Sequence, residues 1–217
     1  MYRYLIFDLD GTVTDSKAGI VRSVDYALKS CGLPEVGPGR DLSWFVGPPL
    51  REGLRELVGT SDSPLIEKLV TKYRERYATI GLYESVPYPG MSGLLSDLSD
   101  HEKVLVLATS KPTIYAKKIL DFFGLGRLFD RIIGCELDGT RSSKEEIIEL
   151  VIGAYGGPNS GYVMIGDRRD DIVGARRNGI DSIGVLYGYG KAAEVTESNP
   201  TFLAETVEEI RAILLPA

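Results

Sequence analysis

Two aspartates, Asp8 and Asp10, lie two residues apart at the end of a short apolar run, Tyr4-Leu5-Ile6-Phe7. If residues 4–9 form a buried strand, both carboxylates point to the same face of it, roughly 6–7 Å apart. Like charges at this separation repel each other unless a cation or a shared proton intervenes. The pair therefore predicts a divalent metal site, an acid/base function, or both.

A calcium-binding loop is one alternative, because Asp8-Leu9-Asp10-Gly11 has the acid spacing with which such loops begin. An EF-hand loop needs Gly at its sixth position and Glu at its twelfth. Counting from Asp8, those positions hold Val13 and Gly19. The sequence therefore argues against a calcium loop.

Polar residues also follow two later apolar segments. Residues 103–108 run into Thr109-Ser110-Lys111-Pro112, and residues 162–165 run into Gly166-Asp167-Arg168-Arg169-Asp170-Asp171. Each group has a simpler interpretation, since hydroxyls cap helices and acids favour helix N-termini. Three acids in five positions nevertheless exceed what a helix cap requires.

The elements that must position these residues change along the chain. Residues 14–83 carry helical periodicity at 17–30, 50–58 and 64–77, without a segment that resembles a buried strand. After residue 91, helices alternate with short apolar strands, expected at 103–108, 131–134, 162–165 and 182–186.

This pattern predicts an α/β fold with a Rossmann-like three-layer core, in which helices cover both faces of a parallel sheet. The opening strand needs such a sheet, so the helical block is expected to be an inserted all-helical cap domain. We predict a core domain at 1–13 and 84–217 and a cap domain at 14–83.

Ligands of open α/β sheets bind beyond the carboxyl ends of the strands. The first, second and fourth expected strands end in carboxylates or hydroxyls, whereas the third and fifth end mostly in Gly, Leu and Tyr. Chemistry is therefore expected where the first, second and fourth strands are neighbours.

Composition narrows the choice of partners and of chemistry. A net charge of −6 over 217 residues argues against a nucleic acid polymer as partner, but a bound cation would still permit a phosphate substrate. The single histidine, His101, excludes histidine triads, which leaves carboxylates, hydroxyls and lysines to do the chemistry.

The cysteines and the apolar runs indicate in which cellular compartment the protein is located. Two well-separated cysteines suggest a reduced, cytoplasmic protein. No membrane partner is expected, since no apolar run approaches the ~20 residues that cross a bilayer, and the opening residues leave no room for a signal peptide. Without a long apolar surface stripe, we expect a monomer or a weak dimer.

Taken together, an acid pair, a hydroxyl, a lysine and a final Gly-Asp-x-x-x-Asp in this order resemble the haloacid dehalogenase superfamily. The chain is most similar to the phosphoglycolate phosphatase-like branch, whose helical cap is inserted just after the first motif. The resemblance covers essentially the whole chain. It implies a Mg²⁺-dependent phosphatase that acts on a small phosphorylated metabolite through an aspartyl phosphate.

The resemblance also implies roles for individual residues. The catalytic set would be the nucleophile Asp8, the general acid/base Asp10, Thr109 and Lys144. The Mg²⁺ ligands would be Asp8, the Asp10 backbone carbonyl, Asp167 and Asp171, the last either directly or through metal-bound water. The phosphoryl group would be bound by the backbone near Gly11 and by the side chains of Thr109, Ser110 and Lys144.

The cap is expected to select the substrate. Arg51, in the first turn of the 50–58 helix, could bind a second anionic group such as the carboxylate of phosphoglycolate, while Trp44 could stack on a nucleobase. Phosphoglycolate is the leading substrate. The alternatives are a 5′-nucleotidase-type phosphatase, a phosphosugar mutase and a non-catalytic phosphate-binding protein.

Overall fold

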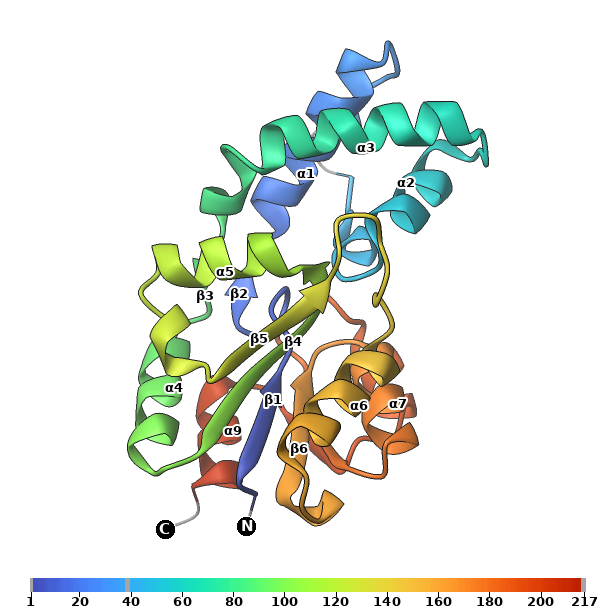
Figure 1. Cartoon of the computed structure of the whole chain (residues 1–217). Helices are drawn as coiled ribbons and strands as arrows, with labels where there is room; N and C mark the ends of the chain where they lie inside the picture. Colours follow the sequence, from blue (N-terminus) through green and yellow to red (C-terminus); the bar gives the residue numbers. More distant parts are fainter. Residues whose placement is uncertain (1, 38–39, 216–217) are drawn as a thin grey trace.

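The computed structural model describes residues 2–37 and 40–215. Its centre is a parallel sheet of six strands in the order β5-β4-β1-β6-β7-β8. Figure 1 shows β5, β4, β1 and β6 of this sheet side by side. The strands are β1 (Tyr4–Phe7), β4 (Val104–Pro112), β5 (Arg131–Cys135), β6 (Tyr162–Gly166), β7 (Asp181–Val185) and β8 (Phe202–Ala204).

Helices cover both faces of the sheet, because successive strand side chains point to opposite sides. Leu5 and Phe7 of β1 pack with one layer of helices, and Ile6 packs with the other. The first layer is α4 (Met91–Asp100), α5 (Thr113–Phe122) and α9 (Val207–Leu214); the second is α6 (Lys144–Tyr155) and α7 (Arg169–Arg177). The predicted three-layer α/β core is confirmed.

A helical segment is inserted between β1 and β4 and lies beyond the carboxyl ends of the strands (Figure 1). We call residues 17–84 the helical cap; it contains α1 (Lys17–Ser30), α2 (Leu50–Val58), α3 (Ser63–Tyr77) and the 3₁₀ turns η1 (Ser43–Phe45) and η2 (Gly81–Glu84). At its two ends, β2 (Thr14–Asp15) pairs antiparallel with β3 (Val86–Pro87). The inserted helical cap is thus confirmed in kind, while the domain limits 1–13, 14–83 and 84–217 stay a prediction.

Several expected element limits were wrong. The first strand ends at Phe7 rather than Leu9, and β4 continues to Pro112 rather than stopping at Ala108. Two elements were not expected at all, the short helix α8 (Ala192–Glu197) and the edge strand β8 at residues 202–204, which precedes α9. Short edge strands with exposed side chains carry little periodicity, which explains why β8 was missed.

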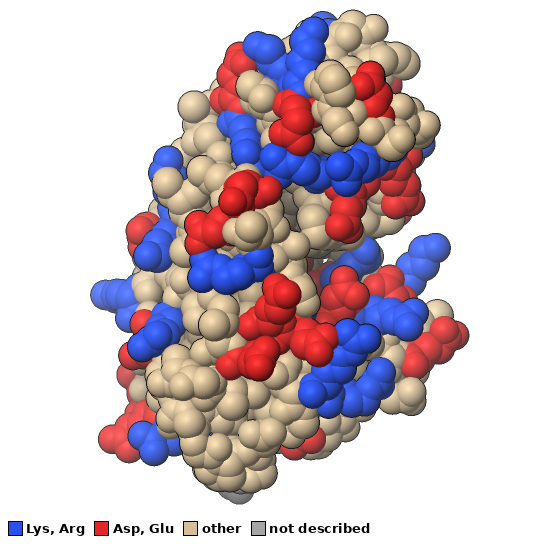
Figure 2. Space-filling view, turned by 45° about the vertical axis from the view of Figure 1, so that its right-hand side comes forward, with Lys and Arg blue, Asp and Glu red and all other residues tan. Residues whose placement is uncertain are grey.

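Among the described residues, no helix is both long and apolar enough to span a bilayer. On the face shown in Figure 2, acidic and basic side chains are interspersed, and the surface is hollowed between the helical cap and the core. This hollow lies on the side of the sheet where the strands end.

Two glycines allow the first helix of the cap to contact the exit of the cap. A Cβ on Gly19, in α1, would lie 2.0 Å from the carbonyl oxygen of Gly81 in η2. Since no side chain fits into this gap, the backbone of η2 packs directly on α1.

We expect Gly19→Ala to destabilise the protein by about 1–3 kcal/mol, the usual cost of overpacking a close contact. Gly153→Ala in α6 is the matched control, because a Cβ there meets nothing within 4 Å; it should be neutral or stabilising by up to about 1 kcal/mol. Urea unfolding measures both free energies. Equal effects at the two positions would contradict the close packing of α1 on η2.

Candidate active site

The three strand ends expected to carry chemistry are neighbours in the structure. β1 lies between β4 and β6. Asp8 directly follows β1, Thr109 lies in the last part of β4, and Asp167 directly follows β6. The Asp8 N–H donates to the Ile165 carbonyl at 2.9 Å, which fixes the two loops side by side.

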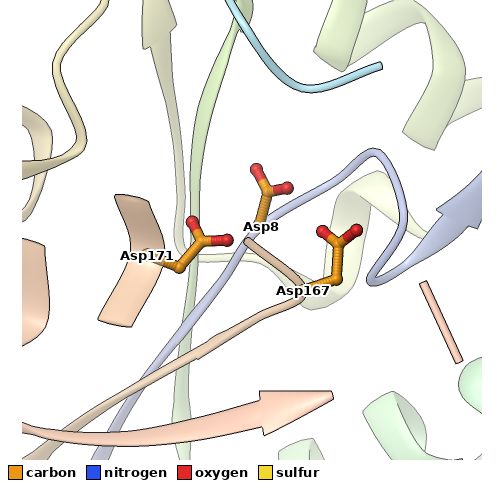
Figure 3. A group of neighbouring side chains, drawn as sticks. All are labelled: Asp8, Asp167 and Asp171. Carbon is orange, nitrogen blue, oxygen red and sulfur yellow. The ribbon is translucent and has the colours of Figure 1, made fainter. Parts of the chain in front are cut away.

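Three buried aspartates gather at this point (Figure 3). Asp8, Asp167 and Asp171 each offer a carboxylate oxygen, and these oxygens lie within 4.8 Å of one another. Asp167 and Asp171 are fully buried, and Asp8 is 4% exposed. The acids come from two places in the chain, since Asp8 follows β1, while Asp167 follows β6 and Asp171 lies in the first turn of α7.

Lys144, the first residue of α6, lies against this cluster. Its Nζ is 2.5 Å from Asp8 Oδ1 and 2.7 Å from Asp171 Oδ1, and it also donates to the Ala108 carbonyl at 2.9 Å. Burial lowers the pKa of Lys144, but the carboxylates of Asp171 and Asp8 raise it more, and the pKa ends above its ordinary value. Lys144 is therefore a fixed positive charge.

The cluster carries more negative charge than Lys144 can balance. Burial, together with the neighbouring carboxylates, raises the pKa of Asp8 to about 6, although Lys144 opposes the shift. Burial and the charges of Asp8 and Asp171 raise the pKa of Asp167 to about 8. With three buried carboxylates and one lysine, the cluster carries an excess of negative charge.

A divalent cation fits this donor set. Mg²⁺ prefers carboxylate, carbonyl and water oxygens, and it is usually bound by one or two protein carboxylates plus substrate phosphate. The three buried carboxylates offer such oxygens, and Lys144 is their one lysine partner among the described residues. The acidic cluster can therefore hold a metal ion, as the sequence suggested for Asp8, Asp167 and Asp171.

Backbone groups bring Asp167 into the cluster. Gly11 has φ +90°, and a Cβ on it would lie 2.3 Å from Asp167 Oδ2, so the carboxylate lies against a position where only glycine fits. The N–H groups of Tyr189 and Gly190 donate to Asp167 Oδ2 at 2.7 and 3.2 Å. No contribution to the site was expected from the residues that follow β7, and this was wrong. They contribute through backbone N–H groups, which leave no signature in the sequence because every residue type except proline has one.

The Tyr189 side chain extends the same loop to the start of the helical cap. Its hydroxyl oxygen accepts the N–H groups of Ser16 and Lys17 at 2.6 and 2.9 Å and donates to Asp15 Oδ1 at 2.6 Å. One residue thus contacts both the acidic cluster and the chain entering α1.

Asp10 lies outside the acidic cluster and has a lysine of its own. Its Oδ1 is 2.6 Å from Lys111 Nζ, and both side chains are buried. Lys111 also donates to the Tyr77 hydroxyl, at 2.5 Å. The sequence predicted both carboxylates on one face of a strand. This was wrong, because β1 ends at Phe7, before either acid, and the two carboxylates bind different lysines.

Sequence reasoning gave Lys111 no function. The sequence pattern placed Lys111 after the end of a strand at Ala108, whereas β4 continues through it. The available signal was its position two residues after Thr109, which places both on one side of an extended strand. The bond from the Lys111 N–H to Thr109 Oγ1, at 3.2 Å, joins the two residues directly.

Of the other predicted substrate-binding residues, Thr109 and Ser110 lie in β4 and Arg51 lies in the helical cap. Thr109 is buried, and Ser110 donates its hydroxyl to the Ser142 carbonyl at 3.1 Å. Arg51 lines a cavity of about 220 Å³ between the helical cap and the core. Its guanidinium is held by Glu67, at 2.6 and 2.9 Å, and by the Asp138 carbonyl at 3.0 Å, so an incoming anion would compete with Glu67.

Residues 5–185 match the family model described as haloacid dehalogenase-like hydrolase. The match spans most of the chain, and the protein belongs to this family. The resemblance inferred from the motifs is thereby confirmed.

Proteins similar to this chain are named for different activities, as three relatives illustrate. A 5′-nucleotidase of Pseudomonas aeruginosa is 40% identical over 98% of this chain and 96% of its own. A phosphoglycolate phosphatase of Agrobacterium fabrum is 34% identical over 85% and 80%. The solved structure of Mycobacterium tuberculosis protein tyrosine kinase A has a TM-score of 0.83 and 37% identity, and it covers 98% of both chains.

Without divalent metal, the protein should lose stability as the pH rises from about 5 to about 8. The folded chain keeps a proton on Asp8 up to about pH 6 and on Asp167 up to about pH 8, the values of their pKa, while an unfolded aspartate, with a pKa of 3.8, has already released its proton. Raising the pH therefore favours the unfolded state. Mg²⁺ should restore stability at pH 8, because it binds the folded carboxylates.

Urea unfolding with EDTA or Mg²⁺ at three pH values tests this expectation. Asp167→Asn should flatten the pH dependence of the metal-free protein and weaken the Mg²⁺ effect. Asp100→Asn, at an exposed position, should change neither. Identical pH slopes in the wild type and in Asp167→Asn would show that the acidic cluster is not short of positive charge.

Proposed function

We propose that this protein is a Mg²⁺-dependent phosphatase that hydrolyses a small phosphate monoester through an aspartyl phosphate on Asp8. The observation that carries the proposal is that two neighbouring acids, Asp8 and Asp10, lie in different surroundings and bind different lysines. Asp8 is fixed by Lys144 inside the acidic cluster, whereas Asp10 lies outside it and lines the cavity under the helical cap. One acid can therefore attack phosphorus while the other handles protons.

In the first half-reaction, an Asp8 carboxylate oxygen attacks the phosphorus atom and the ester P–O bond breaks. Asp10, as the neutral acid, gives its proton to the leaving alcohol oxygen. The Thr109 hydroxyl donates a hydrogen bond to the transferred phosphoryl group, and the positive charge of Lys144 stabilises the negative charge spread over its equatorial oxygens. The alcohol departs, and Asp8 carries the phosphoryl group.

In the second half-reaction, a water molecule attacks the phosphorus atom of the aspartyl phosphate. Asp10, now a carboxylate, takes a proton from that water, and the P–O bond to Asp8 breaks. Inorganic phosphate leaves, and both acids return to their starting states.

The metal would be held by Asp8, Asp167 and Asp171 together with the Asp10 backbone carbonyl. When bound, Mg²⁺ offsets the repulsion between the substrate phosphate and the attacking carboxylate. We also propose a cytoplasmic location, which fits the free thiols of Cys31 and Cys135.

Phosphoglycolate is the leading substrate, and a nucleoside 5′-monophosphate is the runner-up. The named activities of the A. fabrum and P. aeruginosa relatives support the two in turn. Substrate choice is proposed to depend on residues around the cavity under the helical cap, with Arg51 among them.

Asp8→Asn should lower kcat by at least about 10⁴-fold, because loss of the nucleophile removes the covalent route. The amide is close in size to the carboxylate, so the fold should persist by circular dichroism. Phosphate release from p-nitrophenyl phosphate with Mg²⁺ measures activity. Retained activity in a folded Asp8→Asn protein would rule out an aspartyl phosphate on Asp8.

A panel of phosphate esters assayed with Mg²⁺ should show a clear preference for one substrate class. We expect the highest kcat/KM for phosphoglycolate, then for nucleoside 5′-monophosphates, and lower values for hexose phosphates. Uniformly weak rates on every ester would reject both specific assignments, while net isomerisation of a hexose phosphate would indicate a mutase.

A further inference from the structure

Lys111 is a buried cation on the wall of the cavity under the helical cap. Two of its N–H groups bind Asp10 and the Tyr77 hydroxyl, at 2.6 and 2.5 Å. An ammonium group has three donors, and the third has no acceptor among residues 2–37 and 40–215. Lys111 thus has an unused donor beside the proposed acid/base.

The backbone around Lys111 is built to hold it there. The register between β4 and β5 shifts between Thr109 and Pro112. The Lys111 carbonyl passes so close to Gly134 that a Cβ there would lie 2.2 Å from its oxygen. The Lys111 side chain therefore extends from a strand whose backbone is closely packed.

The helical cap completes the environment of Lys111. Tyr77, the last residue of α3, is 1% exposed, and its ring centroid lies 5.0 Å from Lys111 Nζ. By contrast, Arg51 on the same cavity is already paired with Glu67. Lys111 is thus the better placed cation for a substrate group next to the reacting bond.

Charge balance then indicates which substrate group this is. In the proposed first half-reaction Asp10 is an uncharged acid, so Lys111 needs another anion while it is buried. The ester oxygen lies within about 3 Å of Asp10 to receive its proton. A carboxylate on the carbon next to the ester oxygen therefore comes within reach of Lys111.

We propose that Lys111 is a specificity-determining residue that binds an anionic group of the leaving alcohol, a carboxylate one carbon away from the ester oxygen. The substrate carboxylate replaces Asp10 as the partner of Lys111. Asp10 can then hydrogen-bond the ester oxygen. This inference rests on the proposed phosphatase activity and assigns its substrate class as phosphorylated 2-hydroxy acids.

Two esters of equal carbon number test the proposal, 2-phosphoglycolate and ethyl phosphate, which differ in the carboxylate. A hydrogen bond between charged groups is worth about 1.5–3 kcal/mol, or roughly 10- to 150-fold in kcat/KM. We expect the wild type to prefer phosphoglycolate by about this factor. Lys111→Met should bring the ratio of the two kcat/KM values close to one, and Lys111→Arg should retain a preference.

Lys118→Met, on the exposed side of α5, is the matched control and should leave the ratio unchanged. A wild-type ratio near one, or an unchanged ratio in Lys111→Met, overturns the role of Lys111 while leaving phosphatase activity in place. Should Lys111→Met fail to fold, the wild-type and Lys111→Arg ratios decide the question. A wild type inactive on all phosphate esters would refute the proposed function, and the inference with it.

Discussion

Each acid of the Asp8-Leu9-Asp10 motif is neutralised by a different buried lysine, and the rest of the site is arranged around this division. Lys144 reaches Asp8 from the start of α6, and Lys111 reaches Asp10 from β4. Two carboxylates two residues apart would repel each other if they shared one environment. Because their counter-charges come from different elements, one acid can lie within the acidic cluster and the other at the cavity.

The acidic cluster itself depends on close backbone packing. Asp167 occupies space that a side chain on Gly11 would fill, and it takes hydrogen bonds from N–H groups that follow β7. Such contacts fix the position of the carboxylate without supplying a full positive charge, so the pKa values of Asp8 and Asp167 stay raised. The fold therefore holds the cluster in a state that a divalent cation would relieve.

Much of this arrangement could be predicted from the sequence, because strand ends and helix periodicity are local properties. The strand ends carrying Asp8, Thr109 and Asp167 were expected to be neighbours, and they are. What escaped prediction depends on contacts between distant segments. Lys111 looks like any lysine in a turn until β4 is seen to continue through it and Tyr77 is seen to cover it. The N–H groups after β7 escaped for the same reason, since any residue type supplies them.

Tyr189 joins the acidic cluster to the start of the helical cap. Its backbone N–H holds Asp167, and its hydroxyl holds the N–H groups of Ser16 and Lys17, where the chain enters the helical cap. If the cap swings away from the core at this entrance, it must either break the bonds to that hydroxyl or drag the tyrosine with it. A displacement of the cap at this entrance would therefore act on Asp167 through a single residue.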